Sequence, residues 1–123
     1  VPGSSDVVDR TFVTYTNEAK TEMVGVPTDL FDEVGAVSEE VARAMAEGAL
    51  EHSNAEVSGS ATGIAGPGGG SDDKPVGLVH MAAARKGYET EHLRYVFKGD
   101  RDSVRLQAVG TVIDLMRRQA ELP

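Results

Sequence analysis

The pattern of apolar and polar residues changes period several times along the chain, and each change marks a predicted element. The β-branched and aromatic residues Thr-Phe-Val-Thr-Tyr predict a strand over residues 10–16. Asn17 is a good helix cap, so a short helix is expected over residues 18–24, ending near Gly25. A second short helical piece is expected over residues 28–33.

Apolar residues at helical spacing predict two longer helices. Ser38 caps the first, an amphipathic helix that ends near His52 or Ser53. Asp100 caps the second, which runs from residue 101 to about residue 121. One apolar stripe of this helix consists of Val104, Ala108, Val112 and Leu115. A second set extends the apolar surface around the helix: Leu106, Val109, Ile113 and Met116. A helix apolar on so much of its circumference is expected to be buried on two sides or to pack on a partner.

Three more strands are predicted in the second half of the chain. Residues 56–62 read as a strand that enters a glycine-rich loop at 63–71, and residues 76–84 and 89–98 read as an antiparallel hairpin. Strands interleaved with helices predict an α/β fold, and the late hairpin makes its sheet mixed. We therefore expect a three-layer α/β/α sandwich forming a single domain over residues 1–123.

Composition narrows the class of protein. A chain of 123 residues with 40% apolar content fits one globular domain. The formal charge of -8 disfavours direct binding to nucleic acid or to anionic membrane surfaces. The chain contains no cysteine, which is compatible with a reducing compartment, and no apolar run long enough to span a bilayer. We expect a cytoplasmic protein.

The first chemical candidate is a hydroxyl, a phenol and an amine near the start of the chain. Ser5 lies in a turn-forming sequence, and Tyr15 and Lys20 flank the junction between the predicted strand and helix. In a catalytic site, a neutral Lys20 would take the proton of Ser5, and Tyr15 would orient or relay it. The spacing alone fits a turn serine, a strand-end tyrosine and a solvated lysine better.

The second candidate is a site for an anion. The glycine-rich stretch from Thr62 and Gly63 onward could form a nest of backbone N–H groups, or it could be a flexible surface loop. It lacks the Gly-Lys-(Ser/Thr) of a phosphate-binding loop of the Walker type, and a strand follows where a helix should open. Arg101 and Arg105 lie one helical turn apart and could face one anion, although ordinary surface charge explains them as well.

Metal binding is not indicated. His52, His80 and His92 share no metal-ligand spacing, and we expect them to pack on strands or lie on the surface.

Several motifs together resemble one family. Gly-Ser-Ser at residues 3–5, followed by Tyr-Thr-Asn-Glu-Ala-Lys at 15–20, resembles the C-terminal domain of the competence/damage-inducible protein CinA and its stand-alone relative, the nicotinamide-nucleotide amidase PncC. Further matches follow in family order: Gly-Ala-Val-Ser-Glu at 35–39, Thr-Gly-Ile-Ala-Gly-Pro at 62–67, Lys-Pro-Val-Gly at 74–77, and Gly-Asp-Arg-Asp at 99–102. The resemblance covers nearly the whole chain.

The resemblance implies hydrolysis of the amide of nicotinamide mononucleotide to nicotinate mononucleotide and ammonia, a step of pyridine nucleotide salvage without metal or organic cofactor. It makes Ser5 the nucleophile, Lys20 its base and Tyr15 their partner. Thr62, Gly63 and Arg101 become substrate contacts. Members of the family tend to self-associate, which implies a homo-oligomer.

The family carries an upstream strand and helix with Glu-Ser-x-Thr-Gly-Gly, and this chain begins just after that point. We therefore expect the domain to be N-terminally incomplete, with one strand and some substrate contacts missing. The alternative function is a non-catalytic domain that binds a nucleotide or mediates oligomerisation in a competence/damage-inducible protein.

Overall fold

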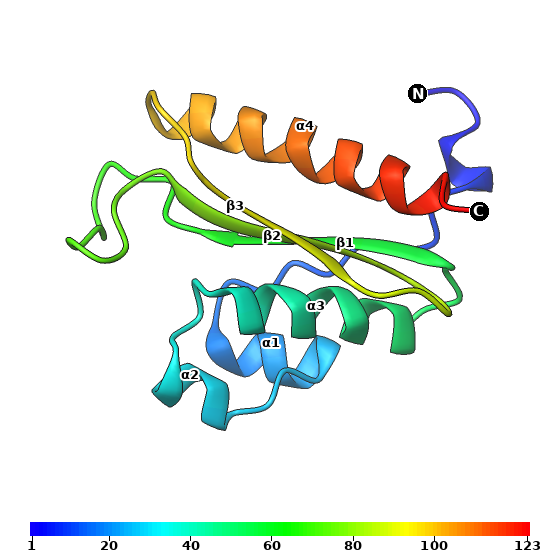
Figure 1. The fold of residues 1–123 in the computed structure, drawn as a ribbon, viewed down its shortest axis with the longest axis horizontal. Helices are drawn as coiled ribbons and strands as arrows, with labels where there is room; N and C mark the ends of the chain where they lie inside the picture. The colour runs from blue at the N-terminus through cyan, green and yellow to red at the C-terminus, as the bar shows by residue number, and fades with distance from the viewer.

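The computed structural model describes all of residues 1–123 and arranges them in three layers, with a sheet between one long helix and a group of three helices (Figure 1). The elements in chain order are the 3₁₀ helix η1 (Ser4–Asp6), α1 (Asn17–Val24), α2 (Asp29–Glu33), α3 (Glu39–Glu51), β1 (Val57–Gly63), β2 (Leu78–Arg85), β3 (Glu91–Val96) and α4 (Arg101–Ala120). The single-domain α/β/α architecture predicted from the sequence is confirmed. No helix combines the length and apolar character needed to cross a membrane.

The sheet has three strands in the order β1-β2-β3, and both neighbouring pairs are antiparallel. The hairpin of β2 and β3 is confirmed, but the sheet is antiparallel throughout rather than mixed. The difference arises at residues 10–16, the first predicted strand, which has no regular secondary structure.

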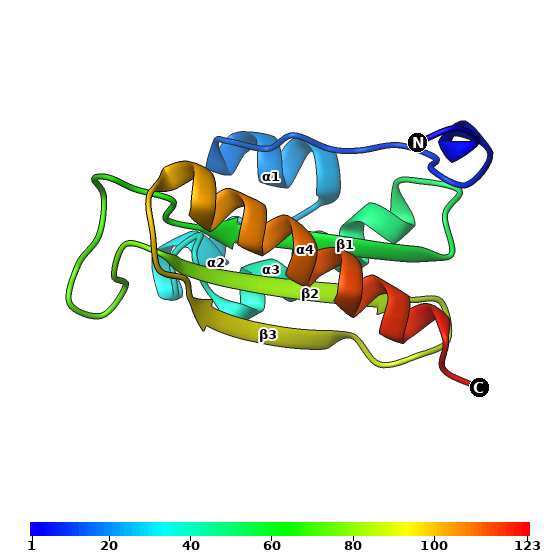
Figure 2. The same ribbon diagram turned by 90° about the horizontal axis from the view of Figure 1, so that it is seen from above.

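Residues 9–15 form no backbone-to-backbone hydrogen bond. They run along the same side of the molecule as β1, but apart from it (Figure 2). The prediction of a strand at 10–16 is therefore wrong, because β propensity provides an extended shape but no partner for a ladder.

Side-chain caps set where the helices begin. The hydroxyl of Thr16 accepts a hydrogen bond from Ala19 N, so Thr16 caps α1, and the predicted cap Asn17 is its first helical residue. Ser38 and Asp100 cap α3 and α4 as predicted. Three of the four α-helices therefore begin at a residue whose own side chain caps the helix.

Small side chains bring α3 close to one face of the sheet. Ala42 and Ala46 of α3 pack against Ala82 and Ala84 of β2, and all four residues are buried. Alternate hydroxyls of β1 then donate to carbonyl groups of α3 and of the turn before it: Ser58 to Ala46 O, Ser60 to Ala42 O and Thr62 to Ala36 O. These bonds fix the height of β1 above α3.

The other face of the sheet is covered by α4, through Val104 and Ala108 against Val79 and Met81. This is the first apolar stripe predicted for the helix. Three of the four residues of the second stripe are exposed, Leu106, Val109 and Ile113, at 74%, 55% and 61% of their full exposure, whereas Met116 is partly buried. Within this chain, α4 is thus buried on one side only.

Candidate functional site: a buried lysine beside the free edge of β1

Lys20 is one of the most deeply buried charged residues of the chain, with 6% of its surface exposed. It lies in the first turns of α1, and its ammonium donates a hydrogen bond of 2.6 Å to the carbonyl oxygen of Thr14. Burial lowers the pKa of Lys20 from its ordinary value of 10.5, because a low-dielectric environment disfavours the ammonium. A lysine in this state is suited to act as a base.

The Lys20 side chain opens on a cavity of about 610 Å³. Tyr15, Thr62 and Gly63 line the same cavity, so the structure brings together four of the six residues proposed from the sequence. Tyr15 is 85% exposed, so most of its side chain faces solvent at the edge of the cavity.

Thr62 has a structural partner as well. Its hydroxyl donates to Ala36 O at 2.8 Å, and the residue is 7% exposed. Because its proton is engaged by the backbone, the hydroxyl could only accept a hydrogen bond from a ligand.

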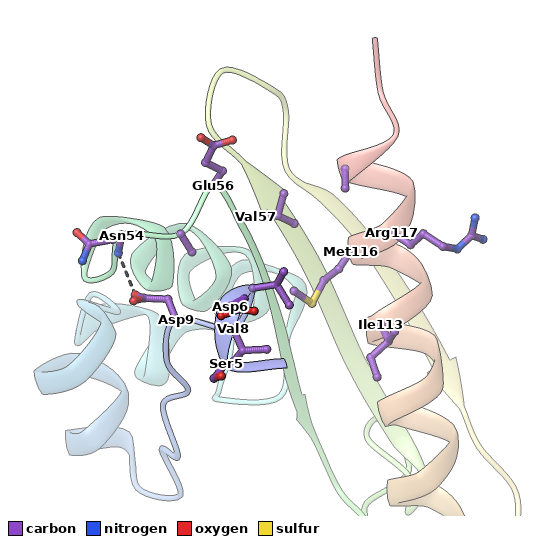
Figure 3. A pocket seen from close by; sticks show the side chains of 13 residues that line it. Ser5, Asp6, Val8, Asp9, Asn54, Glu56, Val57, Ile113, Met116 and Arg117 are labelled. Atoms are coloured by element: carbon purple, nitrogen blue, oxygen red, sulfur yellow. Dashed lines mark hydrogen bonds between the residues drawn. The ribbon is translucent and has the colours of Figure 1, made fainter. Parts of the chain in front are cut away.

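Ser5 is not part of this cluster. It is the middle residue of η1 and lines a separate cavity of about 820 Å³, together with residues before and at the start of β1 and the C-terminal half of α4 (Figure 3). Val57, at the first position of β1, lines the cavity of Ser5, whereas Gly63, at the last position, lines the cavity of Lys20. Ser5 therefore does not meet Tyr15 and Lys20 in this structure, because the two cavities lie at opposite ends of β1.

Arg101 lies beside the glycine-rich loop that follows β1. Its Nη1 donates to Gly66 O at 3.1 Å. Neither Arg101 nor Arg105 forms an ion pair with a carboxylate, and both are exposed. Their positive charge therefore remains available to an anionic group.

The loop itself is irregular, as predicted, and is held at both ends. Lys74 donates from Nζ to Val34 O at 2.5 Å, which ties the loop to the segment between α2 and α3. Gly66 has φ +85°, and an added Cβ there would lie 2.5 Å from Val76, so both its conformation and its surroundings require glycine.

Sequence reasoning missed several residues that shape the cavity. Phe12 and Met45 line it and pack on the cluster of Val24, Val26 and Val41. Phe12 and Thr14 are partly buried whereas Val13 and Tyr15 are exposed, and this alternation was readable from the sequence as an inward and an outward face. Lys74 belongs to a motif of the family resemblance, but its bond to Val34 O could not be read from the sequence, because the acceptor lies 40 residues away. The structure contains no group of three or more His, Asp or Glu side chains that could hold a metal ion.

Residues 1–120 match the family model of the CinA C-terminal domain. The chain belongs to this family. Curated relatives include CinA-like proteins of Geobacter sulfurreducens and Akkermansia muciniphila, which are 49% and 47% identical over 97% of this chain. The matched part is 29% and 30% of these relatives' own lengths, so the chain spans less than a third of them.

Solved structures of the CinA family agree with this fold. The competence/damage-inducible protein CihA of Agrobacterium tumefaciens superposes with a TM-score of 0.96 at 45% identity, over 98% of this chain and 74% of that one. The competence damage-inducible protein A of Klebsiella pneumoniae gives a TM-score of 0.82 at 33% identity, over 90% of this chain and 69% of that one. The chain is thus a CinA-family domain, and its small α/β fold is that of the family.

Proposed function

We propose that this CinA-family domain hydrolyses the amide of nicotinamide mononucleotide, giving nicotinate mononucleotide and ammonia. The observation that supports this most directly is Lys20, a buried amine with a lowered pKa that opens on a cavity beside a phenol. A base works best when its pKa lies near the operating pH, and burial moves Lys20 in that direction.

In this proposal, Lys20 removes a proton from the nucleophile, which attacks the amide carbonyl and forms a tetrahedral intermediate. The carbonyl then reforms as the C–N bond breaks, and Lys20 returns its proton to the departing ammonia, with Tyr15 relaying it at the mouth of the cavity. In this structure Ser5 lines the other cavity, so the nucleophile in our proposal is a water that enters the cavity of Lys20 and becomes the second oxygen of the carboxylate. Arg101 supplies positive charge for the phosphate of the nucleotide.

The test is ammonia release from nicotinamide mononucleotide, compared across a small set of variants. We expect Lys20→Arg to lose nearly all activity although it keeps the charge, because a guanidinium cannot give up its proton at working pH. Ser5→Ala is the matched control and should retain activity. Arg101→Ala should lower ammonia release from nicotinamide mononucleotide far more than ammonia release from nicotinamide riboside, which has no phosphate.

A second candidate function is supported by the exposed stripe of α4. Leu106, Val109 and Ile113 form an apolar face that a partner would bury, which favours a non-catalytic domain that mediates self-association. Two results would exclude the first function: no release of ammonia, and no shift of the Lys20 or Tyr15 NMR signals when the nucleotide is added. If the protein then sediments as an oligomer that Leu106→Glu dissociates, the second function replaces the first.

A further inference from the structure

Two of the histidines that share no metal-ligand spacing in the sequence form a buried pair across the hairpin. His80 of β2 is 9% exposed, and the side chain of His92 of β3 is 12% exposed. Their rings stack with centroids 5.1 Å apart, and His80 Nδ1 lies 2.8 Å from His92 Nε2. A hydrogen bond between two ring nitrogens needs one proton and one lone pair, so at most one of these two atoms is protonated.

The pair is linked to the first turn of α3. Glu39 Oε1 lies 3.7 Å from His92 Nδ1, on the opposite side of the ring from His80. Glu39 is itself held by Arg43 Nε at 2.8 Å, and Arg43 Nη1 donates to Thr90 O at 2.6 Å, just before β3. Side chains of α3, β3 and β2 thus form one connected chain of polar contacts.

We propose that Glu39, His92 and His80 form a pH-dependent clamp that holds β3 against α3 and β2. One arrangement of protons satisfies every contact: His80 Nδ1–H donates to His92 Nε2, and His92 Nδ1–H points at Glu39. Both rings are neutral in this state, and the clamp is closed.

Protons from solvent open the clamp in two steps. The first proton binds His80 Nε2 and leaves the bond between the rings in place, because His80 Nδ1 still donates. The second must bind His92 Nε2, which then has no lone pair to accept with, so two N–H groups face each other between two positive rings. The contact between β2 and β3 on the α3 side is lost at this step.

The charged groups around the pair come from three elements, and most oppose protonation. Burial has the largest effect on the pKa of His80 and lowers it, and His92, Arg94 of β3 and Lys74 of the loop lower it further, whereas Glu39 raises it. Burial also lowers the pKa of His92.

The remaining groups lie on α3. Glu39 and Glu40 act in the opposite direction on His92, and Arg43 opposes its protonation. Because both folded-state pKa values lie below the ordinary value of 6.5, the unfolded chain binds more protons in the window beneath it. The stability contributed by the clamp is therefore complete above about pH 6.5 and is lost as the pH falls below it.

The experiment compares urea unfolding of the full chain with that of His92→Gln and His52→Gln between about pH 7.5 and about pH 5. Glutamine can still hydrogen-bond His80 but does not titrate in this range. We expect the unfolding constant of the wild-type chain to rise with acidification by up to about tenfold per pH unit more than that of His92→Gln. His52, bonded to Gly48 O at the end of α3, lies outside the cluster, and His52→Gln should follow the wild type in slope.

A second measurement keeps the test decisive if His92→Gln does not fold. The chain contains only three histidines, so their imidazole nitrogen signals can each be followed by NMR in the wild-type protein. We expect the signals of His80 and His92 to titrate below about pH 6.5 in coupled steps, with amide exchange in β3 accelerating at the second step. Independent one-proton curves with midpoints near 6.5, or a wild-type slope in a folded His92→Gln, would overturn the clamp.

Discussion

Replacing Lys20 by methionine should stabilise the fold while removing the proposed base. Methionine has nearly the same length and is apolar, so it fills the same space without an ammonium. The ammonium is buried, and its hydrogen-bond partner is a single carbonyl, that of Thr14. One charge-assisted bond of about 1.5–3 kcal/mol offsets a desolvation cost of several kcal/mol only in part. We expect Lys20→Met to be more stable than the wild type by about 1–2 kcal/mol at neutral pH.

The pH dependence of this difference carries the sharper test. The folded-state pKa of Lys20 lies below 10.5, so between that pKa and about 10.5 the unfolded chain binds more protons than the folded one. Within this window, the free energy of unfolding of the wild type should therefore rise by about 1.4 kcal/mol per pH unit relative to that of Lys20→Met. The difference in stability between the two proteins should become smaller as the pH rises.

Equilibrium urea unfolding, followed by circular dichroism at several pH values, measures both quantities. Lys86→Met serves as the control, because Lys86 is exposed and its substitution should leave the pH profile of stability unchanged. A Lys20→Met protein that is less stable than the wild type by the same amount at every pH would refute the reasoning, because Lys20 would then contribute packing rather than a desolvated charge.

Four substitutions at other positions test the packing of the layers. Gly48→Ala would place a Cβ 1.7 Å from Val24 O, so α1 must move away from α3, and urea unfolding should show a loss of about 3 kcal/mol. Gly110→Ala is its matched control, since no atom lies within 4 Å of the new Cβ, and it should gain about 1 kcal/mol of helix stability. Ser60→Ala removes the 2.6 Å bond to Ala42 O and should cost about 1 kcal/mol, with exchange of β1 amides rising first. Asp100→Ala removes the cap of α4 and should lower the midpoint of thermal unfolding by an amount equal to about 1 kcal/mol.

Most of the fold could be predicted because its signals are local. The caps Ser38 and Asp100 act within four residues of themselves, and the hairpin needs only a short turn between two strands. The strand at 10–16 failed for a different reason. Strand formation depends on a partner, and the free edge of β1 lies across a cavity from Phe12 and Thr14 rather than within hydrogen-bonding reach. A propensity scale contains no information on that distance.

The same contrast explains the candidate site. Tyr15 and Lys20 are only five residues apart, on either side of the Thr16 cap of α1, and both line the same cavity. Ser5 and Tyr15 are ten residues apart, and a turn between them would have joined them. The intervening chain is extended instead, and about eight residues at roughly 3.3 Å each span about 26 Å, which is comparable to the length of β1 beside it. A spacing of ten residues is therefore compatible with contact or with opposite ends of a sheet, and only the backbone path decides. That path places Ser5 at the start of β1 and Lys20 beside its end, so in the mechanism proposed above Lys20 activates a water rather than Ser5. We therefore expect Ser5→Ala to release ammonia at the wild-type rate, and a Ser5→Ala protein that folds but releases no ammonia would make Ser5 the nucleophile.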